Sequence, residues 1–200
     1  MKLKRIILAA TATAILAVAA IPVLASGEVM AIGAKLDGFE MPDPAGTTHS
    51  YDTVKGEKGT IVIFLSAQCP VVAAYNDRIN AIAEAYKAKG INMVGIYSNY
   101  TEDLAWVTKH SNENYEFQVL IDKNNVFADR LGASFTPEIF FFNDKDVLDY
   151  HGAIDNDRSG SNITRPFLKT ALNEKLSGKA ISEQSTKAFG CSIKRVKTEG

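Results

Sequence analysis

The stretch that most constrains the fold is residues 60–90, which predicts a buried strand followed directly by a long helix. Residues 60–66 form a continuous apolar, β-branched run, typical of a strand buried on both faces of a helix-covered sheet. Gly90 stands where a helix C-cap glycine belongs. Between them, after Cys69-Pro70, apolar side chains recur along one helical face, at Val72, Tyr75, Ile79, Ile82 and Tyr86. A lone cysteine therefore stands where a core strand turns into a helix.

Cys69 has two interpretations at that junction. Pro70 suits the first helical position, where its missing N–H costs nothing, and the free N–H groups and dipole of the helix favour a thiolate. These effects lower the pKa of a thiol below the value of about 8.5 for free cysteine. The alternative is a buried cysteine that packs as a small hydrophobic side chain. We expect a reactive thiol.

Residues 1–25 differ from the rest of the chain and predict a cleaved secretory signal peptide. Three basic residues precede an alanine-rich apolar run, and residues 23–25 (Val-Leu-Ala) form a small-residue cleavage signature. The alternative is a retained membrane anchor, because the run is long enough to span a bilayer. Cleavage would leave an exported, periplasmic protein without a membrane segment, beginning with a linker at residues 26–35.

The charge balance argues against nucleic acid or anionic lipid as a partner. The chain has 22 basic and 23 acidic residues, and three of the basic and none of the acidic ones lie in residues 1–25, so cleavage leaves a net charge of −4. The hydrophobic content of 46% is sufficient for a sizeable core, so we expect a folded domain rather than disorder.

Cys69 and Cys191 are the two cysteines of the chain. In an oxidising compartment they could form a structural disulfide. They could equally be a catalytic thiol and its resolving partner, since a flexible tail would bring Cys191 to Cys69 at a small loop-closure cost. Their positions in the sequence are compatible with both roles.

The remaining periodicity predicts alternating strands and helices. Further strands are expected at residues 36–41, 47–51, 91–97, 117–121, 138–142 and 147–152. Further helices are expected at residues 99–110, 122–131 and 166–176, the first with Asn99 and Glu102 in capping-box spacing. This order predicts an α/β fold with a mixed central sheet and helices on both faces, followed by a polar tail at residues 179–200.

Four motifs carry a resemblance to a known family. They are C-P-V-x-x-x-Y-x-x-R at residues 69–78, T-P-E-I-F at 136–140, Y-H-G-A-I-D at 150–155 and T-K-x-x-G-C-x-I-K at 186–194. With its cysteine at the mouth of the first long helix, the chain resembles the thioredoxin superfamily. It is most similar to the redoxin or peroxiredoxin-like branch, the relatives of alkyl hydroperoxide reductase and thiol-specific antioxidant proteins. The resemblance implies a thioredoxin-like redoxin domain over residues 36–178.

The resemblance also implies roles for individual residues. Pro137 would form a cis peptide bond beside Cys69, and Thr136 before it would offer backbone groups to a substrate. Cys191, in the tail, would resolve the product formed at Cys69 or brace the fold. The substrate would be a thiol or disulfide protein or a peroxide, and neither a cofactor nor a metal ion is expected.

Two departures separate the chain from the best-known members of the superfamily. Thioredoxins carry C-x-x-C, but residues 70–72 here are Pro-Val-Val, so the nearby second thiol is missing. Peroxiredoxins carry P-x-x-x-T-x-x-C, and here Val62 replaces the proline and Ser66 the threonine. The second departure argues against peroxide reduction, and Cys191 could supply the thiol that the first departure leaves missing.

We therefore expect an exported thiol–disulfide oxidoreductase with Cys69 as its reactive thiol. One alternative is a peroxiredoxin-like thiol peroxidase, in which Cys69 becomes a sulfenic acid. Another is a non-enzymatic module for binding or metal handling, using the surface around Cys69 and Pro137. A metal site would have to draw on Cys69, Cys191 and His151.

The other polar residues have modest expected roles. Arg78 lies too far along the helix to reach the Cys69 sulfur and is expected in a surface ion pair. Glu138 with Asp155 and Asp157 could suggest a carboxylate site, but residues 155–157 read more simply as a turn.

Overall fold

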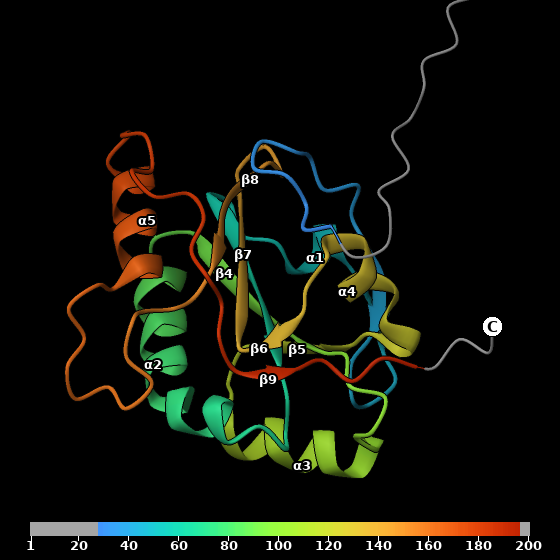
Figure 1. Cartoon of the computed structure of the whole chain (residues 1–200). Coiled ribbons are helices and arrows are strands. Elements are labelled where there is room, and N and C mark those ends of the chain that lie inside the picture. The colour runs from blue at the N-terminus through green and yellow to red at the C-terminus, as the bar shows by residue number, and fades with distance from the viewer. Residues whose placement is uncertain (1–27, 197–200) are drawn as a thin grey trace, which may run out of the picture.

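A five-stranded mixed sheet forms the centre of the fold (Figure 1). The structure, a computed structural model, describes residues 28–196. The strands lie in the order β5-β4-β3-β7-β8, with β3 parallel to β4 and antiparallel to β7. Their bounds are β3 Gly59–Leu65, β4 Ile91–Tyr97, β5 Gln118–Ile121, β7 Glu138–Asn143 and β8 Leu148–Gly152. The predicted α/β class with a mixed sheet is confirmed.

β3 occupies the middle of the sheet because its sequence is suited to burial on both faces. Every residue of the strand is buried, as a continuous apolar run requires. Its antiparallel register with β7 pairs Phe64 with Glu138. The carboxyl end of β3 therefore lies beside the segment that leads into β7.

Helices cover both faces of the sheet, as predicted (Figure 1). The first face packs against side chains from α2 (Pro70–Lys87), α3 (Leu104–Asn114) and α5 (Phe167–Leu176). The second packs against α1 (Tyr51–Val54) and α4 (Val126–Leu131), the latter preceded by the 3-10 turn η1 (Lys123–Asn125). Two separate apolar cores result, one on each side of β3.

Two short strand pairs complete the fold. β1 (Glu40–Pro42) and β2 (Thr48–Ser50) form an antiparallel pair and overlap the strands predicted at residues 36–41 and 47–51. β6 (Phe135–Thr136) pairs antiparallel with β9 (Cys191–Ser192), a strand that the sequence did not predict. Because of β9, the tail is part of the folded domain.

The start of the described chain also packs on the domain. The predicted signal peptide, residues 1–25, lies outside the described residues. Within the predicted linker, Met30 is buried and donates its N–H to the Leu131 carbonyl at 3.0 Å, and the Ala34 carbonyl accepts from Leu148 at 2.9 Å. Across residues 28–196, none of the helices combines the length and the apolar character needed to cross a membrane.

The predicted capping-box start at Asn99 is wrong. α3 begins at Leu104, because the carboxylate of Asp103 accepts the backbone N–H of Trp106 at 2.8 Å. The side chain of Asn99 is hydrogen-bonded outside the helix, at the site described below. α3 also continues beyond its predicted end, to Asn114.

His110 is a half-buried histidine on α3 that contacts β4. Its Nδ1 lies 2.7 Å from the hydroxyl of Tyr97. Burial lowers the pKa of His110 below its ordinary value of 6.5. As the pH falls below that value, the unfolded chain binds a proton at His110 that the folded chain does not, so the folded state loses stability.

The His110→Gln variant tests this contribution. Glutamine keeps an oxygen that can accept from Tyr97, but it does not titrate. We expect the loss of unfolding free energy between pH 7.5 and pH 5 to be smaller in the variant than in the wild type, as measured by urea denaturation. An identical loss in both proteins would contradict the assignment.

Candidate functional site

Cys69 is the N-cap residue of α2, at the junction that the sequence predicts. Its backbone is extended, its carbonyl accepts the N–H of Ala73 at 3.1 Å, and Pro70 fills the first helical position. The side chain is 3% exposed. Cys69 is thus both buried and placed at the amide-rich end of an 18-residue helix.

The segment entering β7 lies directly against Cys69. The Thr136–Pro137 peptide bond is cis, and the carbonyl oxygen of Thr136 lies 3.2 Å from Sγ of Cys69. In the disulfide form this sulfur carries no proton, so the approach becomes a hydrogen bond only in the thiol form. The structure therefore brings together Cys69, Thr136 and Pro137, as the resemblance implies.

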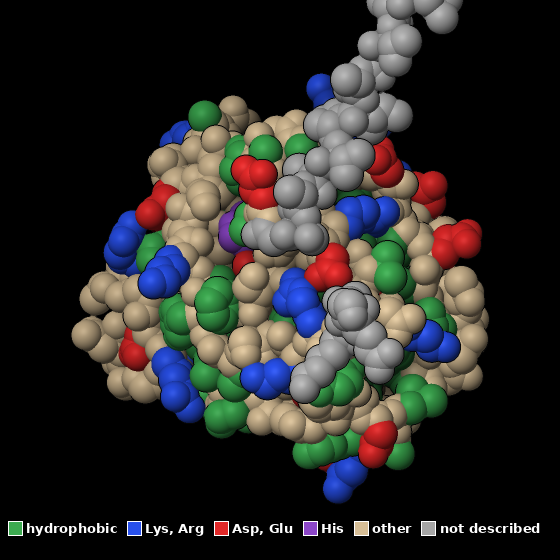
Figure 2. Space-filling view, turned by 45° about the vertical axis from the view of Figure 1, so that its right-hand side comes forward, with side chains coloured by type: hydrophobic (Ala, Val, Ile, Leu, Met, Phe, Trp, Pro, Cys, Tyr) green, Lys and Arg blue, Asp and Glu red, His purple; other side chains and the backbone are tan. Residues whose placement is uncertain are grey.

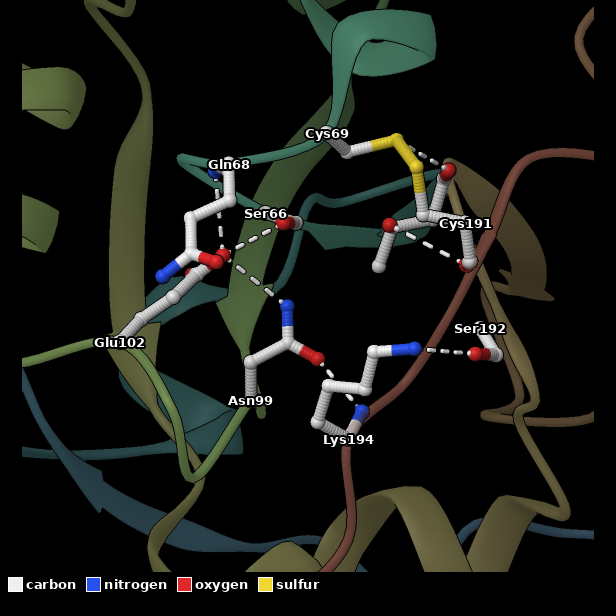
Figure 3. Close-up of a disulfide and its surroundings, with 9 residues drawn as sticks. Ser66, Gln68, Cys69, Asn99, Glu102, Cys191, Ser192 and Lys194 are labelled. Carbon is white, nitrogen blue, oxygen red and sulfur yellow. Dashed lines mark hydrogen bonds between the residues drawn. A yellow bond between two sulfur atoms is a disulfide. The ribbon is translucent and has the colours of Figure 1, made fainter.

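A disulfide joins Cys69 to Cys191 across a separation of 122 residues (Figure 3). The Cα atoms lie 5.9 Å apart, within the ordinary range for a disulfide. Cys191 belongs to β9 and pairs in register with Thr136, whose hydroxyl donates to the Cys191 carbonyl at 3.4 Å. All four predicted site residues therefore lie in one cluster.

The tail around Cys191 is held by hydrogen bonds on both sides, contrary to the expectation of a flexible segment. Before Cys191, the N–H of Thr186 donates to the His151 carbonyl at 3.0 Å. After it, Ile193 is buried and its N–H donates to the Ser134 carbonyl at 2.9 Å. Figure 1 shows this segment running along the domain from α5 to β9.

Gly190 lets the tail approach the Thr136 backbone. Its φ is +153°, and a Cβ at this position would lie 2.1 Å from the carbonyl oxygen of Thr136. That atom belongs to the backbone and cannot move aside. Close pairing of β9 with β6 therefore depends on a residue without a side chain before Cys191.

The Gly190→Ala variant should weaken this pairing. We expect less Cys69–Cys191 disulfide in a glutathione buffer than in the wild type, measured by alkylation of free thiols and mass spectrometry. Gly178→Ala is the matched control, because Gly178 also has a positive φ of +71° but would place its Cβ in open space. Equal disulfide content in the two variants would contradict the role of Gly190.

Glu102 holds the loop that precedes Cys69. Its Oε1 accepts from the hydroxyl of Ser66 at 2.5 Å, the backbone N–H of Gln68 at 3.1 Å and the amide of Asn99 at 3.0 Å. This role is not visible in the sequence, where the spacing of Asn99 and Glu102 predicts a helix cap instead. Within the sequence, no local signal links it to a loop more than 30 residues earlier.

Glu138 holds the segment that carries β6. Its Oε2 accepts the backbone N–H groups of Ser134 at 2.6 Å and Phe135 at 2.8 Å, and its Oε1 lies 2.7 Å from Nε2 of His151. Glu138 is 2% exposed, so these partners satisfy a carboxylate that water cannot reach. His151 is therefore paired with Glu138, and the structure places no metal-binding cluster of three or more His, Cys, Asp or Glu within residues 28–196.

Asp155 is a buried anchor for the loop after β8. Its carboxylate accepts from the hydroxyl of Tyr75 at 2.7 Å, Nη1 of Arg78 at 2.8 Å and the N–H of Asp157 at 3.0 Å. The Arg78 guanidinium also lies 3.7 Å from the centre of the Tyr75 ring. Arg78 forms the expected ion pair, but with a buried carboxylate and not at the surface. Glu138 and Asp155 do not form a common site, because they bond different partners.

Removing the Asp155 carboxylate should destabilise the fold. In Asp155→Ala, the Tyr75 hydroxyl loses its acceptor and the Arg78 guanidinium loses its carboxylate partner, both largely shielded from water. We therefore expect a loss of about 3 kcal/mol in unfolding free energy. Asp77→Ala, at an exposed position of α2, should change it by less than about 0.5 kcal/mol. Urea denaturation of the oxidised proteins measures both, and equal losses would contradict the anchoring role.

The surface beside the tail has a mixed character. Figure 2 shows Lys and Arg side chains interspersed with Asp and Glu on this face, with hydrophobic side chains between them. Within the tail, Arg195 pairs with Asp129 of α4 at 2.6 Å. A partner approaching this face would therefore meet both signs of charge.

Comparison with known proteins identifies the family. Residues 32–151 match the AhpC/TSA family, which is more than half of the chain. The chain belongs to the AhpC/TSA family. No curated protein matches the chain. The match includes Cys69, Thr136 and Pro137, whereas Cys191 lies beyond its end.

Solved structures share the fold of this AhpC/TSA family protein. A hypothetical protein from Sinorhizobium meliloti 1021 is 28% identical, with a TM-score of 0.77 over 84% of this chain and 97% of its own. An uncharacterised conserved protein from Geobacillus kaustophilus is 26% identical, with a TM-score of 0.78 over 84% and 94%. A protein provisionally identified as the thiol:disulfide interchange protein DsbE from Chlorobium tepidum is 19% identical, with a TM-score of 0.58 over 74% and 97%. This last likeness shows the fold alone.

Proposed function

We propose that the protein is an exported thiol–disulfide oxidoreductase in which Cys69 is the attacking thiol and Cys191 the resolving thiol. The observation that carries the proposal is the disulfide between the N-cap of α2 and strand β9, beside the Thr136–Pro137 peptide. Membership of the AhpC/TSA family and the fold shared with DsbE support redox chemistry of this class. Export is supported by the leader-like sequence of residues 1–25.

The proposed reaction starts from the dithiol form. The Cys69 thiolate attacks one sulfur of a substrate disulfide, forms a mixed disulfide and expels the other substrate sulfur as a thiolate. The Cys191 thiolate then attacks Sγ of Cys69 and releases the second substrate thiolate, leaving the intramolecular disulfide. Two electrons pass from the protein to the substrate. An external dithiol must then reduce the protein for another cycle.

Two features of the site support Cys69 as the attacking residue. The amide-rich end of α2 stabilises a thiolate, which makes the sulfur both a better nucleophile at neutral pH and a better leaving group. The backbone of Thr136 would position a substrate segment beside it. In the disulfide form β9 occupies that edge, so a substrate and the tail would take turns at Thr136.

Peroxide reduction is a second candidate, favoured by the family match. Two features make it the weaker one. The hydroxyl of Ser66, at the position of the peroxiredoxin threonine, donates to Glu102. Arg78 lies too far along α2 to reach the Cys69 sulfur, so neither side chain is placed to hold a peroxide beside Cys69.

Cysteine variants test the proposed roles in reduction of a protein disulfide such as that of insulin by dithiothreitol. We expect Cys69→Ser to abolish the acceleration. Cys191→Ser should still attack the substrate but accumulate a mixed disulfide at Cys69, which mass spectrometry detects. A fully active Cys69→Ser variant would contradict the proposal, and a Cys191→Ser variant with normal turnover and no trapped adduct would make Cys191 structural.

Stopped-flow reaction of the reduced protein with hydrogen peroxide separates the two candidates. For a disulfide oxidoreductase we expect Cys69 to react at about the rate of an ordinary thiolate. A reaction faster by several orders of magnitude would favour the peroxidase instead. Cys69→Ser is the control that identifies the reacting sulfur.

A further inference from the structure

A non-covalent link lies beside the disulfide and joins the same two segments of chain (Figure 3). On the tail side it begins at Lys194, three residues after Cys191. Oδ1 of Asn99 accepts the backbone N–H of Lys194 at 2.7 Å, and the N–H of Tyr100 donates to the Lys194 carbonyl at 3.0 Å. Both backbone groups of Lys194 are thus held by the loop between β4 and α3.

The other end of the link reaches the loop before Cys69. The amide nitrogen of Asn99 donates to Oε1 of Glu102, and the same oxygen accepts from Ser66 and Gln68. The Asn99 amide therefore faces Glu102 with its donor and Lys194 with its acceptor, as Figure 3 shows. Because a carboxylate only accepts hydrogen bonds, Glu102 determines which way this amide points.

We propose that Asn99, oriented by Glu102, is a positioning residue that raises the effective concentration of the Cys191 thiol at Cys69. This inference rests on the proposed function, in which that disulfide forms and breaks. The two sulfurs are separated by 122 residues of chain. Their encounter therefore depends on contacts that hold the tail beside the loop that carries Cys69. Asn99 contacts both segments at once.

The test is the equilibrium of the oxidised protein with reduced glutathione. Two glutathione thiols reduce the Cys69–Cys191 disulfide, giving the protein dithiol and one glutathione disulfide, so the equilibrium constant reports the effective concentration of the two protein thiols. Alkylation and mass spectrometry measure the dithiol fraction. We expect Asn99→Ala to lower the effective concentration about 25-fold, from the loss of two hydrogen bonds at about fivefold each.

Asn80→Ala is the matched control. Asn80 is also half-buried, and its amide donates to the Asn114 carbonyl at 2.7 Å, joining α2 to α3 away from both cysteine segments. A general loss of stability would affect both variants, whereas a positioning role moves the glutathione equilibrium only in Asn99→Ala. Equal shifts in the two variants would overturn the proposal.

A double-mutant cycle tests the part assigned to Glu102. If Glu102 orients the amide, then Asn99→Ala should lower the effective concentration of the Cys191 thiol by a smaller factor in a Glu102→Ala background than in the wild type. Strictly additive effects would overturn that part of the proposal. The glutathione equilibrium needs no protein substrate. A wild type that forms the disulfide but reduces no substrate would therefore contradict the proposed function, while the equilibrium would still test the role of Asn99. Absence of the disulfide from the oxidised wild type would overturn both.

Discussion

The antiparallel pairing of β3 with β7 is the interaction on which the rest of the site depends. With Phe64 opposite Glu138, the ladder ends where β3 leads toward Cys69 and where Pro137 leads into β7. Two segments almost 70 residues apart in sequence are thereby brought to within van der Waals distance, so that the Thr136 carbonyl reaches Sγ of Cys69. The cores on both faces of the sheet keep this register, because a slip by one residue would exchange their side chains.

The tail supplies the thiol that the first helix does not contain. In a C-x-x-C arrangement helical geometry places the second sulfur beside the first. Here Cys191 reaches Cys69 from a separate strand, so tertiary contacts have to bring the second sulfur beside the first. Three contacts hold the tail in this position: the pairing of β9 with β6, the close approach of Gly190 to Thr136 and the hydrogen bonds to Lys194. Any redox reaction of this pair is therefore coupled to docking of the tail.

Three carboxylates organise the loops around this arrangement, each with a different segment. Glu102 holds the loop before Cys69, Glu138 holds the segment of β6, and Asp155 holds the loop after β8 against α2. For Glu138 and Asp155, backbone N–H groups or neighbouring donors take the place of water, so the charged group fixes a loop instead of destabilising the interior. Glu102 fixes its loop through Oε1, while its buried Oε2 has no hydrogen-bond partner in the described structure. The irregular chain around the disulfide is therefore held in place by hydrogen bonds to these side chains.

The α/β fold and the position of Cys69 at a strand-to-helix junction could be predicted from the sequence alone, and the motifs around Pro137 and Cys191 pointed to the residues that meet there. These predictions rest on local signals, namely apolar periodicity, proline placement and short motifs. Each signal lies within the segment whose structure it predicts. Only the tertiary structure decided that Asn99 and Glu102 bridge the two cysteine segments, that Arg78 is engaged by a buried Asp155, and that the tail docks as β9. The physical reason is that these hydrogen bonds join residues far apart in the chain, and their partners are set by the register of strands and the packing of loops.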